Sequence, residues 1–319
     1  MVFSGLLLIA GLLIAVSTGA KNIGLKTIWD SIFHYNDVLE MQLVRDIRIP
    51  RAICSLIAGG ILGITGAMMQ GVSRNPIAEP SIMGISQGAT LAIAILYASE
   101  SIAGLLGNMT AAFLGALVSG LLVLGFSIKN ARNMNMARVL LAGTALSTFF
   151  VSLASAIALL SNKSQFLAFW VSGGFRTATW SSAVLLSIVG LLGIVGSSYL
   201  AQRINIVSLG EDIAIGLGEN PIRIRVLTFL LIIPLCAGVV AVAGNIGFVG
   251  LIIPQIARKL VGQDYRKIIP CSFVLGSVLL VFADISARLV NLPYETPIGL
   301  FTAIIGVPFF IIQVRKERG

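Results

Sequence analysis

Nine stretches that carry almost no charge divide this chain, and they constrain its fold more than any other feature. Most of them are close to the roughly 20 apolar residues that a helix needs to cross a bilayer, or exceed this number. Charged residues make up only 11% of the chain, against about 25% in an average soluble domain. The sequence therefore predicts an all-α, polytopic membrane protein, and it excludes both a soluble domain and a disordered chain. The stretches are Met1–Ala20, Ala52–Met69, Ile82–Ala98, Ile102–Ile128, Val139–Leu160, Trp180–Leu200, Val226–Ala257, Ile268–Val281 and Thr296–Val314.

The stretch Val226–Ala257 is too long to be one straight spanning helix. Its 32 residues would extend about 48 Å as a helix. The glycines around Asn245 mark a break in its middle, and Arg225 and Arg258 flank its ends. We expect a hairpin of two short helices with both arginines on one side, which brings the total to about ten helices.

Basic residues are distributed unevenly among the connecting segments. Lysine and arginine exceed aspartate and glutamate by nine over the whole chain, and a helix count that starts inside puts 14 of the 22 basic residues in cytoplasmic segments. This asymmetry is typical of membrane topology and does not indicate a nucleic-acid partner. It predicts that both termini are cytoplasmic.

Motifs for covalent chemistry are missing from the sequence. It contains no Gly-x-x-x-x-Gly-Lys-Ser/Thr run, so any ATP hydrolysis must occur on a separate chain. The three cysteines, Cys54, Cys236 and Cys271, lie far apart in apolar runs, and the chain has one histidine. We therefore expect no catalytic residue, no metal site and no cofactor in this chain.

A series of motifs resembles the FecCD-type permeases, the membrane subunits of bacterial ABC importers for iron–siderophore complexes, haem and cobalamin. The resemblance covers about residues 45 to 314 and is most specific at Gly247-Phe-Val-Gly-Leu-Ile-Ile-Pro254. Asn245 and Gln255 stand where the family often has proline and histidine. The other motifs are Arg48-Ile-Pro-Arg51, Gly66-Ala-Met-Met-Gln-Gly71, Arg74-Asn-Pro-Ile-Ala-Glu-Pro80, Gly84-Ile-Ser-Gln-Gly-Ala89, Leu209-Gly-Glu-Asp-Ile-Ala214, Ala283-Asp-Ile-Ser-Ala-Arg288 and Glu295-Thr-Pro-Ile-Gly299.

For the outer face, the resemblance implies that Arg48, Arg51 and Arg288 dock acidic residues of an extracytoplasmic substrate-binding protein. A guanidinium group suits this role because it stays charged and grips a carboxylate with two bonds. The alternative is local anchoring, with Asp46 and Asp284 as partners. Asp284 and Arg288 have the i, i+4 spacing of a helical ion pair.

For the cytoplasmic face, the resemblance implies that the loop 201–225 couples the chain to an ATPase. The segment Leu209–Asn220 is expected to form two short helices, with a sharp turn at Gly210 and Gly218. The alternative is an ordinary amphipathic loop on the bilayer surface. Under the coupling interpretation, the apolar contacts come from Leu209, Ile213 and Leu217, and the charged contacts come from Glu211 and Glu219.

The resemblance also places a cytoplasmic gate at two helix ends. Asn75 and Ile77 lie at the inner end of the second helix, and Asn135 and Met136 align with an opposing loop. The alternative for the first pair is a plain helix end followed by an Asn-Pro turn.

Together these features predict one transmembrane permease domain over residues 1–319, in the bacterial cytoplasmic membrane. The expected partners are two ATPase subunits that hold ATP and magnesium, a substrate-binding protein, and a second permease chain, identical or related. Iron–siderophore complexes are the first expectation for the cargo because that role is commonest in the family, with haem and cobalamin as alternatives. An ion-driven secondary transporter and a membrane-embedded enzyme are the rival classes.

Overall fold

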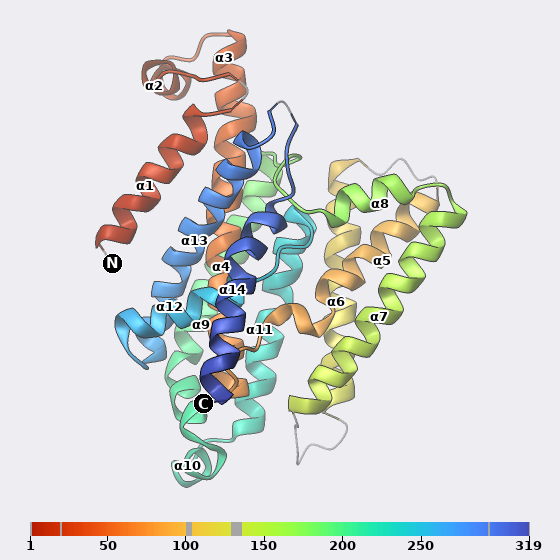
Figure 1. Ribbon diagram of the computed structural model, residues 1–319, viewed down its shortest axis with the longest axis vertical. Helices are drawn as coiled ribbons and strands as arrows, with labels where there is room; N and C mark the ends of the chain where they lie inside the picture. Colours follow the sequence, from red (N-terminus) through yellow and green to blue (C-terminus); the bar gives the residue numbers. More distant parts are fainter. Residues whose placement is uncertain (1, 20, 100–103, 129–135, 293, 319) are drawn as a thin grey trace.

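A computed structural model of the chain describes residues 2–19, 21–99, 104–128, 136–292 and 294–318. Every apolar stretch of the sequence lies on a helix in the described part, and Val226–Ala257 lies on two (Figure 1). The helices are α1 (Val2–Ser17), α2 (Leu25–Phe33), α3 (Leu39–Gln42), the π-helical η1 (Leu43–Arg48), α4 (Ile49–Ser73), the 3-10 turn η2 (Pro80–Met83), α5 (Ile85–Ala98), α6 (Leu105–Ser127), α7 (Met136–Leu160), α8 (Ser164–Val171), α9 (Trp180–Leu209), α10 (Glu211–Gly216), α11 (Pro221–Ala243), α12 (Val249–Val261), α13 (Tyr265–Leu289) and α14 (Ile298–Arg318).

Among the described residues, six helical segments are long and apolar enough to cross a membrane, and three shorter apolar helices accompany them. Together with α12, they account for the ten helices expected from the sequence. The chain is therefore a multi-pass membrane protein. Short connections join most of the helices in the described part of the chain.

Helix α4 forms the centre of the fold and packs against α9, α11, α12 and α13. Small residues let these backbones approach closely, as is common in membrane helices. A β-carbon added at Gly59 would lie 2.3 Å from the carbonyl oxygen of Gly276 on α13, and one at Gly66 would lie 2.0 Å from that of Gly250 on α12. The glycines of α4 are thus required by close helix packing.

Helices α5, α6 and α7 form a second group, seen to the right in Figure 1, and α8 lies across one end of it. Contacts between α6 and α11 join this group to the first. Gly88 and Gly115 allow α5 and α6 to pack closely, since a β-carbon on Gly115 would lie 2.5 Å from the Gly88 carbonyl oxygen.

The predicted break in the long apolar stretch occurs between α11 and α12. Gly244 has a φ of +65° and Phe248 has a φ of +70°, so the chain reverses there through left-handed backbone. Glu79 accepts a hydrogen bond from the backbone N–H of Phe248 at 2.7 Å, which satisfies one donor at the start of α12.

A proline inside α12 leaves a backbone carbonyl without its helical partner. Pro254 lacks the N–H that would bond the carbonyl of Gly250, and Gln70 of α4 donates to that carbonyl instead, at 3.2 Å. Gln255 donates to the carbonyl of Pro76 at 2.7 Å. Two glutamine side chains, one on α4 and one on α12, thus donate to backbone carbonyls that have no helical partner. Such carbonyls need a partner within the protein because the bilayer core holds no water.

The two arginines that flank the long stretch lie at the same end of α4. Arg225 donates to the carbonyl of Val72 at 3.1 Å. Arg258 donates to the hydroxyl of Tyr265 at 2.8 Å, and the Tyr265 ring packs against Gly71. The predicted hairpin with both arginines on one side is confirmed, although α11, with 23 residues, is longer than the short helix expected.

The segment 201–225 is more helical than expected. Helix α9 continues to Leu209 because Leu200, Ile204 and Val207 stay buried at helical spacing. Only one short helix, α10, follows it, where two were predicted. Asn220 then caps α11 by accepting from the N–H groups of Ile222 and Arg223, both at 3.1 Å.

Candidate functional site

The charged and exposed features that the sequence singled out gather at two opposite ends of the molecule (Figure 1). One end carries α2, α3 and the start of α4, and we call it the Arg51 end. The other carries α10 and the last residues of α4, and we call it the α10 end.

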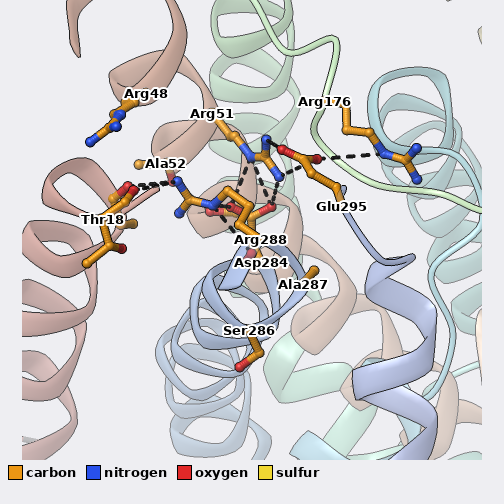
Figure 2. Close-up of polar contacts among 12 residues, drawn as sticks. Thr18, Arg48, Arg51, Ala52, Arg176, Asp284, Ser286, Ala287, Arg288 and Glu295 are labelled. Carbon is orange, nitrogen blue, oxygen red and sulfur yellow. Dashed lines mark hydrogen bonds and ion pairs between the residues drawn. The ribbon is translucent and has the colours of Figure 1, made fainter. Parts of the chain in front are cut away.

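Arg51 is the centre of an ionic cluster at the Arg51 end (Figure 2). It lies in the first turn of α4, and its Nη2 and Nε atoms contact the carboxylate of Asp284 on α13, at 2.9 and 3.1 Å. Its Nη1 atom donates to Glu295 at 2.6 Å. Asp284 and Arg51 are both buried. One guanidinium group thus joins α4, α13 and the connection between α13 and α14.

Two further arginines cap α1 from outside that helix. Arg48 donates to the carbonyls of Val16 and Ser17, both at 2.9 Å, and Arg288 donates to that of Ala15 at 3.0 Å. The last carbonyls of a helix have no intrahelical partner and favour a nearby positive charge. Helix α1 has no basic residue in its own last turn, so the two arginines supply this charge.

The pair Asp284–Arg288, expected from its i, i+4 spacing, is confirmed with a separation of 3.2 Å. Sequence reasoning missed that Asp284 also binds Arg51 and that Arg176 lies 3.7 Å from Glu295. Three guanidinium groups therefore face two carboxylates, and the cluster carries one excess positive charge. Asp46, the other suggested partner, is exposed.

The three arginines predicted to dock a binding protein are all buried and bonded within the chain. Their docking role stays a prediction. Their burial favours an indirect form of it, in which they hold the helix ends beneath the surface that a partner would meet.

At the α10 end, a row of apolar side chains faces outward. Leu209, Ile213, Ile215 and Leu217 are each at least half exposed. Gly210, with a φ of +137°, and Gly218, with a φ of +81°, turn the chain on either side of α10. Exposed apolar patches on a protein mark surfaces that another molecule covers.

The two glutamates predicted to meet the ATPase have partners within the chain. Glu211 lies 2.7 Å from a guanidinium nitrogen of Arg225, and Glu219 lies 3.9 Å from one of Arg203. The side chain of Glu211 is half exposed, so one side of it remains open to a partner.

The described gate residues lie in two places, after the end of α4 and at the start of α7. Asn75 follows the end of α4, and its side-chain oxygen accepts from the N–H of Ile77 at 3.0 Å, which is the local turn that Asn-Pro favours. Both are half-buried. Met136 opens α7, and Asn135 lies outside the described residues.

Within the described part of the chain, no group of three or more histidine, cysteine, aspartate or glutamate residues is placed to hold a metal ion. Cys54, Cys236 and Cys271 are free and buried. The geometry thus gives a buried ionic cluster at the Arg51 end and an exposed apolar row at the α10 end.

Comparison with known proteins shows that nearly the whole chain matches one protein family. Residues 7–316 match the FecCD transport family. The chain is 42% identical over 313 residues to the iron(3+)-hydroxamate import system permease protein FhuB of Bacillus subtilis, covering 98% of this chain and 82% of the relative. It is 36% identical to the iron-uptake system permease protein FeuB of the same organism, covering 97% and 92%. It is 31% identical to the hemin transport system permease protein HmuU of Yersinia pestis, covering 98% and 95%.

A solved structure shares the fold. It is described as an inward-facing conformation of a putative metal-chelate type ABC transporter, and it matches with a TM-score of 0.84 and 29% identity over 98% of this chain and 97% of that one. The similarity extends over the α4-centred group and the α5–α7 group alike, because almost the full chain is covered.

Proposed function

The chain belongs to the FecCD transport family, and we propose that it is the permease subunit of an ATP-driven importer for an iron–siderophore complex. The 42% identity with a permease named for iron(3+)-hydroxamate import carries this proposal. Hydroxamate siderophores are therefore the first cargo class, and haem is the second because of the 31% identical hemin permease. Cobalamin is a third.

The α10 end is the surface we assign to the two ATPase subunits, which would bind ATP and magnesium. The exposed row Leu209, Ile213 and Leu217 supports this assignment, since apolar side chains in water gain free energy when a partner covers them. Gly210 and Gly218 fix the shape of the projecting turn, and Glu211 and Glu219 offer charge at its edge.

The Arg51 end is the surface we assign to the substrate-binding protein. Arg48, Arg51 and Arg288 lie there together, with one excess positive charge in the Arg51 cluster. A net positive end favours an acidic partner.

A second permease chain, identical or related, would complete the path for the cargo. Helix α7 supports this assignment because it is the least buried of the six long spans. Only 17% of its most apolar 18-residue segment is buried within the chain. Asn75, Ile77 and Met136 would form the gate at the α10 end of this path, and Asn135, which lies outside the described residues, stays a predicted member of it.

The assignment of the α10 end to the ATPase subunits also implies an orientation in the membrane. The α10 end faces the cytoplasm, where ATP is available. In Figure 1, α14 ends nearer the α10 end than the Arg51 end, and α1 runs toward the Arg51 end. With the α10 end inside, we propose that both termini are cytoplasmic, as the distribution of basic residues predicts.

The mechanism is alternating access without covalent chemistry in this chain. ATP binding and hydrolysis on the partner chains would change the balance between outward-open and inward-open states by binding the two states unequally. The chain itself supplies the path, the gate and the contact surfaces.

The cargo is tested by uptake of iron-55 in a strain that lacks this chain, offered one hydroxamate siderophore, one catecholate siderophore or haem at a time, with labelled cobalamin alongside. We expect hydroxamate uptake to be lost and to return with the wild-type chain. Loss of haem or cobalamin uptake alone would replace the proposed cargo within the same family. Normal uptake of all four would contradict the cargo assignment.

A further inference from the structure

Arg225, in the first turns of α11, is a buried cation that joins two other elements. It is 5% exposed, although its sequence position suggested a loop residue that sets topology. Its Nε atom donates to the carbonyl of Val72 at 3.1 Å, and its Nη2 atom lies 2.7 Å from a carboxylate oxygen of Glu211. One guanidinium group therefore spans from the end of α4 to the first residue of α10.

The bond to Val72 has a specific cause in the sequence. The carbonyl of Val72 would normally accept from the N–H four residues later, but that residue is Pro76, which has no N–H. Helix α4 ends at Ser73, and Arg74 leaves it in a left-handed conformation with a φ of +53°. Arg225 satisfies a carbonyl that the helix cannot, just before Asn75 and Ile77.

The bond to Glu211 connects this site to the surface of α10. Only 6% of the Arg225 side chain is exposed, against 51% of that of Glu211. A partner that covers α10 therefore meets the glutamate and leaves the arginine enclosed. Because a guanidinium group is a rigid fork, a shift of Glu211 changes the position of the donor that holds Val72.

We propose that Arg225 is the positioning residue that transmits movement of α10 to the end of α4 and so to the segment of Asn75 and Ile77. This inference rests on the proposed function, because it needs an ATPase at α10. It makes the ion pair a mechanical link between ATP hydrolysis and the gate.

The test compares transport with ATP hydrolysis in the assembled complex in proteoliposomes. Arg225→Lys keeps the charge but replaces the two-directional fork with a single point donor. We expect transport per ATP hydrolysed to fall about tenfold, within the usual range of coupling between two sites, while hydrolysis and assembly persist. Arg223→Lys is the matched control, since Arg223 lies two residues earlier on α11 and is exposed.

A second variant keeps the test valid if Arg225→Lys does not assemble. Glu211→Ala removes the other half of the link at a half-exposed position, and we expect it to lower the same ratio. A wild-type ratio in either assembled variant would overturn the proposal. Absence of ATP-dependent transport by the wild-type complex would overturn the proposed function itself, which is a different result.

Discussion

Replacing Arg51 by leucine is expected to destabilise the folded chain by about 3–5 kcal/mol, because the change leaves buried carboxylate charge without its main partner. Among the described residues, Asp284 would keep Arg288 as its ionic partner and Glu295 would keep the more distant Arg176. The measurement is the thermal unfolding midpoint of the purified protein in detergent, followed by size-exclusion chromatography after heating.

Arg45→Leu is the matched control for this prediction. Arg45 precedes Arg51 by six residues but is exposed and contacts the ring of Tyr35, so its loss is expected to change stability by less than about 0.5 kcal/mol. Arg51→Lys is expected to fall between the two, because an ammonium group cannot bind two carboxylates as a planar fork does. Equal unfolding midpoints for Arg51→Leu and Arg45→Leu would show that the cluster does not hold the helix ends together.

Introducing charge on the exposed face of α10 is expected to abolish transport without unfolding the chain. In the double variant Ile213→Asp, Leu217→Asp, two side chains that are at least half exposed become charged, which is tolerated at a free surface. At an interface, central side chains of this kind contribute about 2 kcal/mol or more each. We expect the ATPase to be lost on affinity purification and uptake to fall to the level of the deletion strain.

Leu39→Asp controls for the cost of placing a charge on an exposed leucine. Leu39 is 66% exposed, close to the 61% of Leu217, but it lies on α3 at the Arg51 end. This variant is expected to retain the ATPase. Retention of the ATPase and full uptake by the double α10 variant would remove α10 from the coupling role and reopen the ion-driven alternative.

The length and composition of the uncharged stretches sufficed to predict the helical architecture. A bilayer accepts only structures that satisfy every backbone polar group internally, and a helix of about 20 apolar residues does so. The hairpin of α11 and α12 was predicted from length alone. The 32 uncharged residues of Val226–Ala257 are more than one straight helix needs to cross the bilayer. The extension of α9 to Leu209 was missed because the apolar stretch ends at Leu200 and residues 201–225 were interpreted as a loop. The spacing of Leu200, Ile204 and Val207 carried the signal for a continuing helix.

The ionic cluster was predictable only where its partners are neighbours in sequence. Asp284 and Arg288 are four residues apart, and this spacing alone indicated their contact. Arg51 and Asp284 are 233 residues apart, and only tertiary packing brings them together. The link through Arg225 has the same origin, although the proline four residues after Val72 marks a carbonyl that needs an outside donor.

The energy source for transport is the most direct test of the account. Proteoliposomes that hold this chain with its co-purified partners are loaded with ATP or with a non-hydrolysable analogue, and uptake of the iron-55 hydroxamate complex is measured with the binding protein outside and a protonophore present. The account predicts uptake that requires hydrolysable ATP and is unaffected by the protonophore. Uptake that proceeds without ATP and is abolished by the protonophore would contradict it.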